Sequence, residues 1–201
     1  QKEARNLRLL TSLQEKKEML LGLGVDHVEV LPFTKDFSSM TTEEYLRYVM
    51  ERFGAKAVLL GYDNRMGSDA KGTDHVARTA ERLGLEALRA DMIPSDGGFA
   101  VSSTKIRQEL EAGEVEAAAA MLGYRYSLHG VVVAGNRLGR TIGFPTANMQ
   151  LYEPLKLVPG NGVYFVRVNT VGRSLYGMCN IGYRPTVSAG NARTIETNIF
   201  G

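Results

Sequence analysis

The spacing of apolar positions divides the chain into a first part of alternating helices and strands and a second part made mainly of strands. Residues 12–15 read Ser-Leu-Gln-Glu and residues 41–44 read Thr-Thr-Glu-Glu. Both are capping boxes, and they predict one helix ending near Leu23 and another over 45–54. A third helix is expected near 74–83. Strands are expected over 26–33, over 55–62 and near 85–93.

Helices and strands that alternate at this spacing predict a parallel sheet with helical crossovers. The continuous apolar run 55–62 is typical of a strand buried on both faces. Ligands of parallel sheets bind beyond the carboxyl ends of the strands, which points to the loop 61–72 with Asp63 and Arg65. An ordinary glycine-rich loop with solvated charges explains the same composition equally well.

A second polar cluster, SSTKIRQELEAG, spans residues 102–113. It predicts a helix with Ser103 as its N-cap, and Ser103 and Arg107 share one helix face. Free amide groups and a guanidinium at a helix N-terminus can hold a phosphate. Plain capping beside an exposed arginine is the simpler interpretation, and the residues alone favour it.

The pattern changes after a short helix expected over 114–123. Glycine, proline and β-branched residues dominate from there, and no helix of three turns is expected. Strands are predicted around Gly130, on both sides of a turn within 162–183, and over 192–200. This part predicts a small antiparallel β-barrel or sandwich, and the boundary between the two parts falls near 123–127.

Composition narrows the class of protein. Apolar residues make up 44% and charged residues 23%, as in ordinary globular proteins. There is no apolar run of the roughly 20 residues that span a bilayer, and no signal-peptide pattern, so a membrane is not expected as a partner. The single cysteine, Cys179, excludes an intrachain disulfide and fits the cytoplasm. It is expected to be a small buried apolar residue.

The charge is unevenly distributed. From Tyr126 onward there are seven basic and two acidic residues, a net charge of +5 over the last 76 residues. The whole chain carries +2, so the first 125 residues carry −3. A modestly basic second part suits a phosphorylated ligand and is too weak an argument for nucleic acid.

The stretch GNRLGRTIGFPTANM, residues 135–149, combines three glycines at four-residue spacing with two arginines. It is not a Walker A loop, because its glycine spacing is one residue short and Arg140 stands where lysine is required. Pro145 also prevents the helix that must follow such a loop. A different phosphate cradle and a flexible hairpin remain equally good interpretations.

If it is a cradle, glycine amides approach an anion closely while Arg137 and Arg140 pair with phosphate oxygens. In an extended segment after Pro145, Thr146 and Asn148 point to the same side. Their oxygens suit a Mg²⁺ that also binds nucleotide phosphates and water.

Glu196 lies in TIETNIF, where it alternates with Ile195 and Thr197. Such a carboxylate can accept a proton from an attacking hydroxyl during phosphoryl transfer. A solvated glutamate is the more common explanation of an isolated acid on a strand.

These motifs together resemble the bacterial bifunctional riboflavin kinase/FAD synthetase family over nearly the whole chain. GYDNRMG and the run from Ser102 to Tyr126 are similar to its adenylyltransferase half, and LHGVVVAGNRLGRTIGFPTAN, NIGYRPTV and TIETNIF to its kinase half. The resemblance implies phosphorylation of riboflavin to FMN by ATP and adenylylation of FMN to FAD.

The resemblance also implies the fold and the site. The fold is a Rossmann-like nucleotidyltransferase domain over 1–123, then a riboflavin kinase-like β-barrel over 124–201. Glu196 matches the base, and Thr146 and Asn148 match the Mg²⁺ and phosphate residues. The residues expected to bind ATP in the kinase half are those of the glycine-rich loop: Gly135, Arg137, Gly139, Arg140 and Gly143. The residues expected to bind a nucleotide in the adenylyltransferase half are Asp63, Arg65, Ser103, Thr104 and Arg107.

Three features depart from the family pattern. The glycine- and histidine-rich first adenylyltransferase signature is absent, since none of His27, His75 and His129 lies in a His-x-Gly-His pattern. Asn198 stands where the family usually has histidine; asparagine can form hydrogen bonds but cannot shuttle a proton. The chain also stops just after the base, so we expect it to lack parts of both domains and to belong to a longer protein.

Two functions are alternatives to a bifunctional enzyme. One is a riboflavin kinase whose first half is inactive, and the other is a non-catalytic module that binds nucleotides or RNA. The second alternative is weaker, because single-strand binding uses aromatic stacking platforms and the tyrosines here are scattered. The expected partners are therefore the small molecules ATP, riboflavin and FMN. The oligomeric state is left open.

Overall fold

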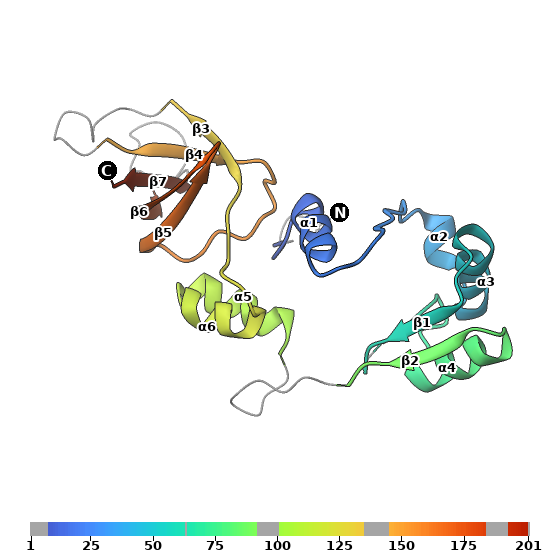
Figure 1. Cartoon of the computed structure of the whole chain (residues 1–201). Helices are drawn as coiled ribbons and strands as arrows, with labels where there is room; N and C mark the ends of the chain where they lie inside the picture. Colours follow the sequence, from blue (N-terminus) through green and yellow to red (C-terminus); the bar gives the residue numbers. More distant parts are fainter. Residues whose placement is uncertain (1–7, 63, 92–100, 135–144, 184–192, 201) are drawn as a thin grey trace. The chain divides into compact units, whose positions relative to one another are not determined.

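The computed structural model describes the chain except residues 1–7, 63, 92–100, 135–144, 184–192 and 201 (Figure 1). Contacts divide it into two compact units. Unit 1 comprises Gln1–Val25 and Val101–Gly201, and unit 2 comprises Asp26–Ala100. This division differs from the predicted boundary at 123/124, which rests on motifs and stays a prediction.

Unit 2 is a small α/β layer. Its elements are α2 (Lys35–Ser39), α3 (Thr42–Phe53), β1 (Ala57–Leu60), α4 (Thr73–Arg82) and β2 (Glu86–Arg89). Strands β1 and β2 are parallel neighbours, and α4 forms the crossover between them, as the alternating pattern predicts. The capping box at Thr41 and Glu44 begins α3, and Gly54 ends it in the left-handed conformation.

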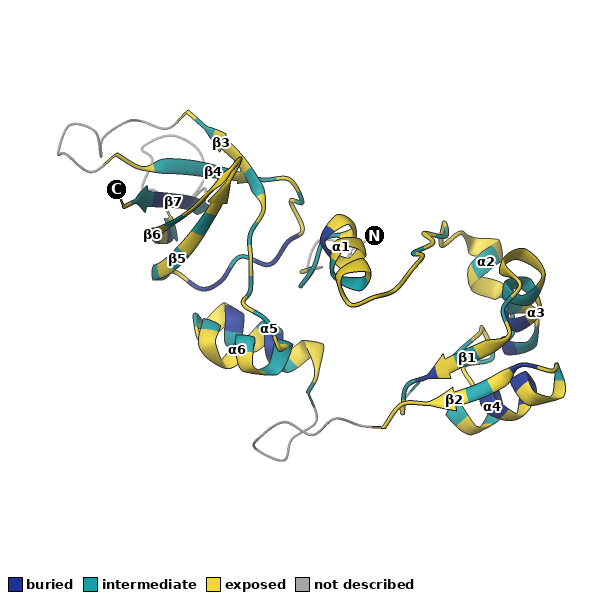
Figure 2. Ribbon diagram, in the orientation of Figure 1, coloured by how far each residue is buried: buried dark blue, intermediate teal, exposed yellow. Residues whose placement is uncertain are grey.

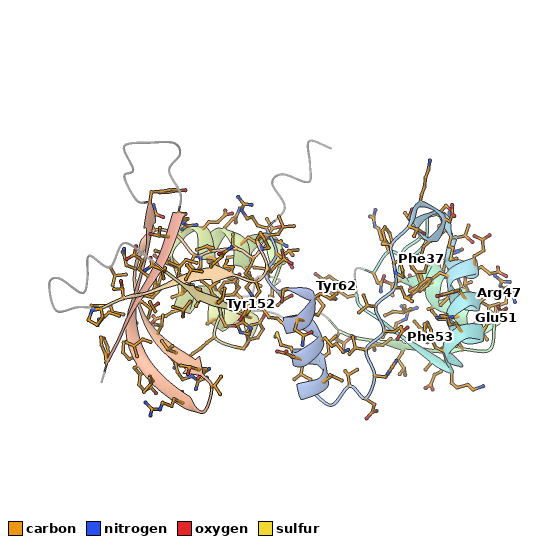
Figure 3. The ribbon with its side chains drawn as sticks, turned by 90° about the horizontal axis from the view of Figure 1, so that it is seen from above. Phe37, Arg47, Glu51, Phe53, Tyr62 and Tyr152 are labelled. Atoms are coloured by element: carbon orange, nitrogen blue, oxygen red, sulfur yellow. The ribbon has the colours of Figure 1, made fainter. Side chains whose placement is uncertain are left out.

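The core of unit 2 lies on one face of the two strands. Leu46 of α3 and Ala80 of α4 are fully buried beside Leu85, and Leu60 is buried against Val76. A chain of edge-to-face aromatic contacts links α2 to α3, with Phe37 5.8 Å from the ring of Tyr48 and Tyr48 6.1 Å from Phe53. Figure 3 labels Phe37 and Phe53 in this cluster.

Two expectations for unit 2 are wrong. Residues 26–33 form no strand, because a strand needs a hydrogen-bonded neighbour and the described sheet consists of β1 and β2. Strand β1 is buried on one face only. Leu59 and Leu88, which are paired across the two strands, are 67% and 46% exposed. Figure 2 colours most of β2 as exposed, whereas β1 ends in the buried Leu60.

In unit 1, the described residues form three helices and an antiparallel sheet. The helices are α1 (Leu13–Gly22), α5 (Ser103–Ala112) and α6 (Val115–Leu122). The strands are β3 (Gly130–Val133), β4 (Ala147–Leu151), β5 (Gly162–Thr170), β6 (Arg173–Tyr183) and β7 (Arg193–Ile199). The sheet order is β3-β4-β7-β6-β5, so the described strands form an open five-stranded sheet. Closure into a barrel stays a prediction.

Strand alternation decides which side chains of unit 1 enter the core. Cys179, Ile181 and Ile195 are buried together, and the burial of the lone cysteine confirms the expectation from the sequence. A second cluster joins Ile106 and Leu110 of α5 to Leu157, which lies between β4 and β5. The described residues after Gly123 include no helix, as predicted.

A buried ion pair attaches α1 to the rest of unit 1. Lys156 Nζ lies 2.6 Å from Glu15 Oε2 and donates to the Leu10 carbonyl at 2.8 Å. The two charged residues are only 5% and 6% exposed. The same ammonium lies 4.5 Å from the centre of the Tyr126 ring. Backbone hydrogen bonds between Leu9 and residues 155 and 157 continue this attachment.

Glu15 has two roles at once. Its carboxylate accepts the Ser12 amide at 2.7 Å in the capping box of α1 and also pairs with Lys156. Burial by itself would raise the pKa of this carboxyl. The hydrogen bonds from Lys156 and Ser12, together with the Lys156 charge and His129, hold the pKa below its ordinary 4.5.

We expect Glu15→Gln to destabilise unit 1 by about 3–5 kcal/mol, because it leaves the buried Lys156 ammonium without a counter-charge. Glutamine still accepts the capping hydrogen bond. Glu44→Gln is the matched control, since Glu44 caps α3 in the same way and is hydrogen-bonded to Thr41 rather than to a lysine. Urea unfolding should show a large loss in the first variant alone; equal losses would contradict a special role for the ion pair.

The same ion pair predicts that the stability of unit 1 depends on pH. Because the pKa of Glu15 is lower in the folded chain than in the unfolded chain, its contribution to stability is fully present above about pH 4.5. It is lost as the pH falls through the lowered value. Thermal unfolding between pH 7 and pH 3 should therefore decline less steeply for Glu15→Gln than for the wild type. If the melting temperatures of the two proteins fall in parallel with pH, Glu15 is not responsible for the loss of stability in acid.

Candidate functional site

The polar residues predicted for phosphoryl transfer come together where β4 pairs with β7. Asn148 is directly opposite Glu196 in the antiparallel register, so the two side chains share a face of the sheet. Thr146 lies just before β4, and its hydroxyl is 3.5 Å from Glu196 Oε2. Residues 50 positions apart in the chain are thereby brought to one place.

Two further asparagines flank Glu196. Asn180 of β6 is its register partner on the other side. Asn198, two residues along β7, donates its side-chain amide to the Pro145 carbonyl at 2.8 Å. The row Asn148–Glu196–Asn180 therefore crosses three adjacent strands, and Asn198 contacts the segment that carries Thr146.

An apolar surface continues from this row across β6 and β5. Phe165 and Tyr176 are stacked, with ring centres 5.4 Å apart and ring planes 11° from parallel. Both are exposed, as are Met178, the register partner of Phe165, and Val163, the register partner of Asn180. Flat aromatic side chains thus lie on the same face as the carboxylate.

The kinase loop residues Gly135, Arg137, Gly139, Arg140 and Gly143 lie outside the described residues. No group of three or more His, Cys, Asp or Glu side chains that could hold a metal ion exists within the described part of the chain. The candidate metal donors are instead the neutral oxygens of Thr146 and Asn148, beside the Glu196 carboxylate.

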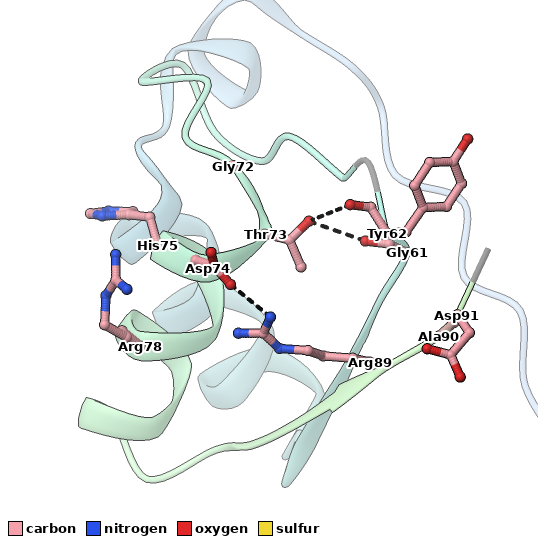
Figure 4. A pocket seen from close by; sticks show the side chains of 10 residues that line it. All are labelled: Gly61, Tyr62, Gly72, Thr73, Asp74, His75, Arg78, Arg89, Ala90 and Asp91. Carbon is pink, nitrogen blue, oxygen red and sulfur yellow. Dashed lines mark hydrogen bonds and ion pairs between the residues drawn. The ribbon is translucent and has the colours of Figure 1, made fainter.

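A second candidate site lies in unit 2, at the carboxyl ends of β1 and β2. It is an open cavity of about 580 Å³ (Figure 4). Gly61 and Tyr62 line it after β1, Ala90 and Asp91 after β2, and the remaining lining residues come from the start of α4 and from Arg89. This is the end of a parallel sheet where ligands are expected.

The N-terminus of α4 contributes to that cavity. Its N-cap is Gly72, which has no side chain to accept the first amides of the helix. The Thr73 hydroxyl lies within hydrogen-bonding distance of the carbonyls of Gly61 at 3.1 Å and Tyr62 at 3.3 Å. Asp74 pairs with Arg89 at 2.6 Å and so connects α4 to β2. Sequence reasoning pointed to the loop 61–72 but missed Thr73, Asp74 and Arg89. The signal for them was a Gly-Thr pair that opens a helix directly after the glycine-rich loop.

The loop 61–72 is held in place by its own polar residues. Asp69 Oδ1 accepts the Thr42 amide at 3.0 Å and the Thr42 hydroxyl at 2.9 Å. Thr42 is fully buried, and Gly67 has a φ of +77°. Arg65 in this loop is exposed, and Asp63 lies outside the described residues.

The third predicted cluster, at the start of α5, belongs to unit 1. Ser103 is not the N-cap as expected; Ser102 is, because its extended backbone lets its hydroxyl accept the Lys105 amide at 3.2 Å. Ser103 and Thr104 are exposed in the first turn. Arg107 donates to the Arg8 carbonyl at 2.8 Å, so it helps to bind the segment before α1.

Comparison with known proteins identifies the family. Residues 1–105 match the model of FAD synthetase, and residues 122–201 match the model of riboflavin kinase. The chain belongs to the riboflavin kinase/FAD synthetase family. The bifunctional riboflavin kinase/FMN adenylyltransferase of Listeria monocytogenes is 34% identical over 98% of this chain and 62% of its own length. That of Escherichia coli K12 is 35% identical over 95% of this chain and 61% of its own length.

Members of this family extend beyond the present sequence, which spans about three fifths of the length of these curated relatives. A crystal structure described as a macrolide-efflux protein from Streptococcus pneumoniae has a TM-score of 0.85 and 31% identity, and covers 95% of this chain and 61% of its own. Among the described residues, no helix is long and apolar enough to cross a membrane.

Gly67 offers a test of how the loop 61–72 is held. Gly67→Ala should destabilise unit 2 by more than the about 1–3 kcal/mol of backbone strain at positive φ. The reason is that a Cβ there would overlap the backbone nitrogen of Thr42. Gly84→Ala is the matched control, since Gly84 has a φ of +87° with nothing within 4 Å of its Cβ position. Thermal unfolding and hydrogen exchange of the loop would distinguish them, and equal losses would count against the Thr42 contact.

Proposed function

We propose that the protein containing this chain phosphorylates riboflavin to FMN with ATP, and adenylylates FMN to FAD. The observation that carries the kinase activity is the meeting of Thr146 and Asn148 with Glu196 across the β4–β7 pairing. The family supports both activities, through matches to riboflavin kinase and FAD synthetase. The part from residue 124 onward is then a kinase barrel, and the preceding part is a Rossmann-like nucleotidyltransferase.

In the phosphoryl transfer, the terminal ribityl hydroxyl of riboflavin attacks the γ-phosphorus of ATP. The bond from that phosphorus to the β–γ bridging oxygen breaks, ADP leaves, and the hydroxyl proton goes to the Glu196 carboxylate. The stacked rings of Phe165 and Tyr176 on the same face suit a planar flavin ring nearby.

The residues present fit a magnesium ion. Thr146 and Asn148 supply neutral oxygen donors, and Mg²⁺ commonly takes few protein ligands because it shares its shell with phosphates and water. When bound, such an ion neutralises charge on the transferring phosphate. Thr146 and Asn148 would orient it, and Gly135, Arg137, Gly139, Arg140 and Gly143 remain proposed ATP-binding residues.

For the adenylyltransferase activity, the cavity at the carboxyl ends of β1 and β2 suits a nucleotide. The uncapped N-terminus of α4, with His75 and Arg78 beside it, favours an anion. Asp63, Arg65, Ser103, Thr104 and Arg107 remain proposed nucleotide residues. ATP chemistry and the free Cys179 suit a cytoplasmic protein.

The direct test is to incubate the whole protein with riboflavin, ATP and Mg²⁺ and to separate the flavins by chromatography. FMN followed by FAD supports both activities, and FMN alone supports a kinase with an inactive first half. If neither product forms while nucleotide or RNA still binds, the chain is a binding module and the proposal fails.

Glu196→Gln should slow FMN formation by roughly 10²–10⁴-fold while flavin and ATP binding are kept, because only the proton acceptor is lost. Glu153→Gln is the matched control, because Glu153 is the other acid after Tyr126. Its carboxylate accepts the Leu155 amide at 3.0 Å, in the segment between β4 and β5. Single-turnover rates and equilibrium binding of ATP should be measured for both. Unchanged turnover in Glu196→Gln would remove Glu196 from the mechanism.

A further inference from the structure

The pairing that builds the kinase site is short. Among the residues that the structure describes, β4 and β7 are matched at two positions, Ala147 with Thr197 and Asn148 with Glu196. Thr146 comes immediately before these pairs, and Pro145 precedes it. Proline has no amide hydrogen, so the backbone at Pro145 cannot donate to a neighbouring strand. Some other group must hold Pro145 and Thr146 against β7.

Asn198 supplies that contact. Its Nδ2 lies 2.8 Å from the Pro145 carbonyl, a good distance for a hydrogen bond. A carbonyl only accepts, so the asparagine must present its NH₂ group here. Asn198 and Glu196 are two residues apart on β7 and therefore on one face, while Pro145 and Thr146 are adjacent. The Asn198–Pro145 bond thus lies next to the 3.5 Å approach of Thr146 to Glu196.

We propose that Asn198 is a positioning residue that extends the β4–β7 pairing by one side-chain hydrogen bond and so holds the Thr146 hydroxyl beside Glu196. The inference rests on the proposed kinase function for its effect on turnover. Its structural half, that Asn198 fixes the Pro145–Thr146 segment, stands on the contact alone.

A positioning role restricts which side chains can function at residue 198. The side chain must donate a hydrogen bond. Alanine removes the donor, and aspartate keeps the size but places a carboxylate oxygen against the Pro145 carbonyl oxygen. Histidine can donate through a ring N–H. Because Thr146 and Asn148 are the proposed metal and phosphate residues, losing the contact should weaken use of Mg·ATP rather than of riboflavin.

The experiment compares Asn198→Ala, Asn198→Asp and Asn198→His in the whole protein. We expect the alanine and aspartate variants to lose between about tenfold and a hundredfold in kcat/KM for Mg·ATP, with the KM for riboflavin little changed. The histidine variant should recover most of the loss. Asn169→Ala is the matched control, because Asn169 is hydrogen-bonded to Ser174 at 2.9 Å on the same sheet.

Hydrogen exchange without substrate provides a second readout. The amides of 147 and 148 should exchange faster in Asn198→Ala than in Asn169→Ala, while those of β5 and β6 stay protected. Full activity in the alanine or aspartate variant, or equal loss in all three variants, would overturn the proposal. If exchange changes as expected but the wild type makes no FMN, the kinase function fails and the positioning of Thr146 by Asn198 stands.

Discussion

The buried ion pair between Glu15 and Lys156 anchors α1 to the rest of unit 1, together with the backbone hydrogen bonds of Leu9. Glu15 and Lys156 are 141 positions apart, yet they meet at 2.6 Å with almost no exposure. Two buried charges are costly unless each satisfies the other, so any arrangement that separates them is strongly disfavoured. Lys156 is followed directly by Leu157 and Val158, which belong to the helical and sheet cores respectively. The pair therefore fixes the segment that joins the two cores.

Because of this attachment, the boundary of the compact unit differs from the boundary between the two family matches. The residues that match FAD synthetase, 1–105, include α1, whereas α1 packs in unit 1 with residues that match riboflavin kinase. Arg193, three residues before Glu196, bonds the carbonyls of Val158 and Pro159. The segment held by Lys156 is thus also bound to the strand that carries the proposed base.

Local signals predicted most of the secondary structure. Both capping boxes begin helices, and the parallel pairing of β1 with β2 follows from the alternating pattern. The predictions were wrong where secondary structure or burial depends on packing and pairing partners elsewhere in the chain. Residues 26–33 have strand-like alternation but no described neighbour to pair with, and β1 has an apolar composition but only one covered face. The N-cap shifted by one residue because Ser102 and Ser103 are equivalent in sequence and differ only in backbone conformation.

By itself, the sequence determined the chemistry that is available: a carboxylate in TIETNIF, two neutral oxygens after Pro145, and one cysteine in an apolar position. The tertiary structure decided which of these groups meet. Antiparallel register alone sets Asn148 opposite Glu196, and the contact from Asn198 to Pro145 has no signature in the spacing of residues. The physical reason is that spacing within a strand assigns a face, whereas distance between strands depends on pairing partners far along the chain.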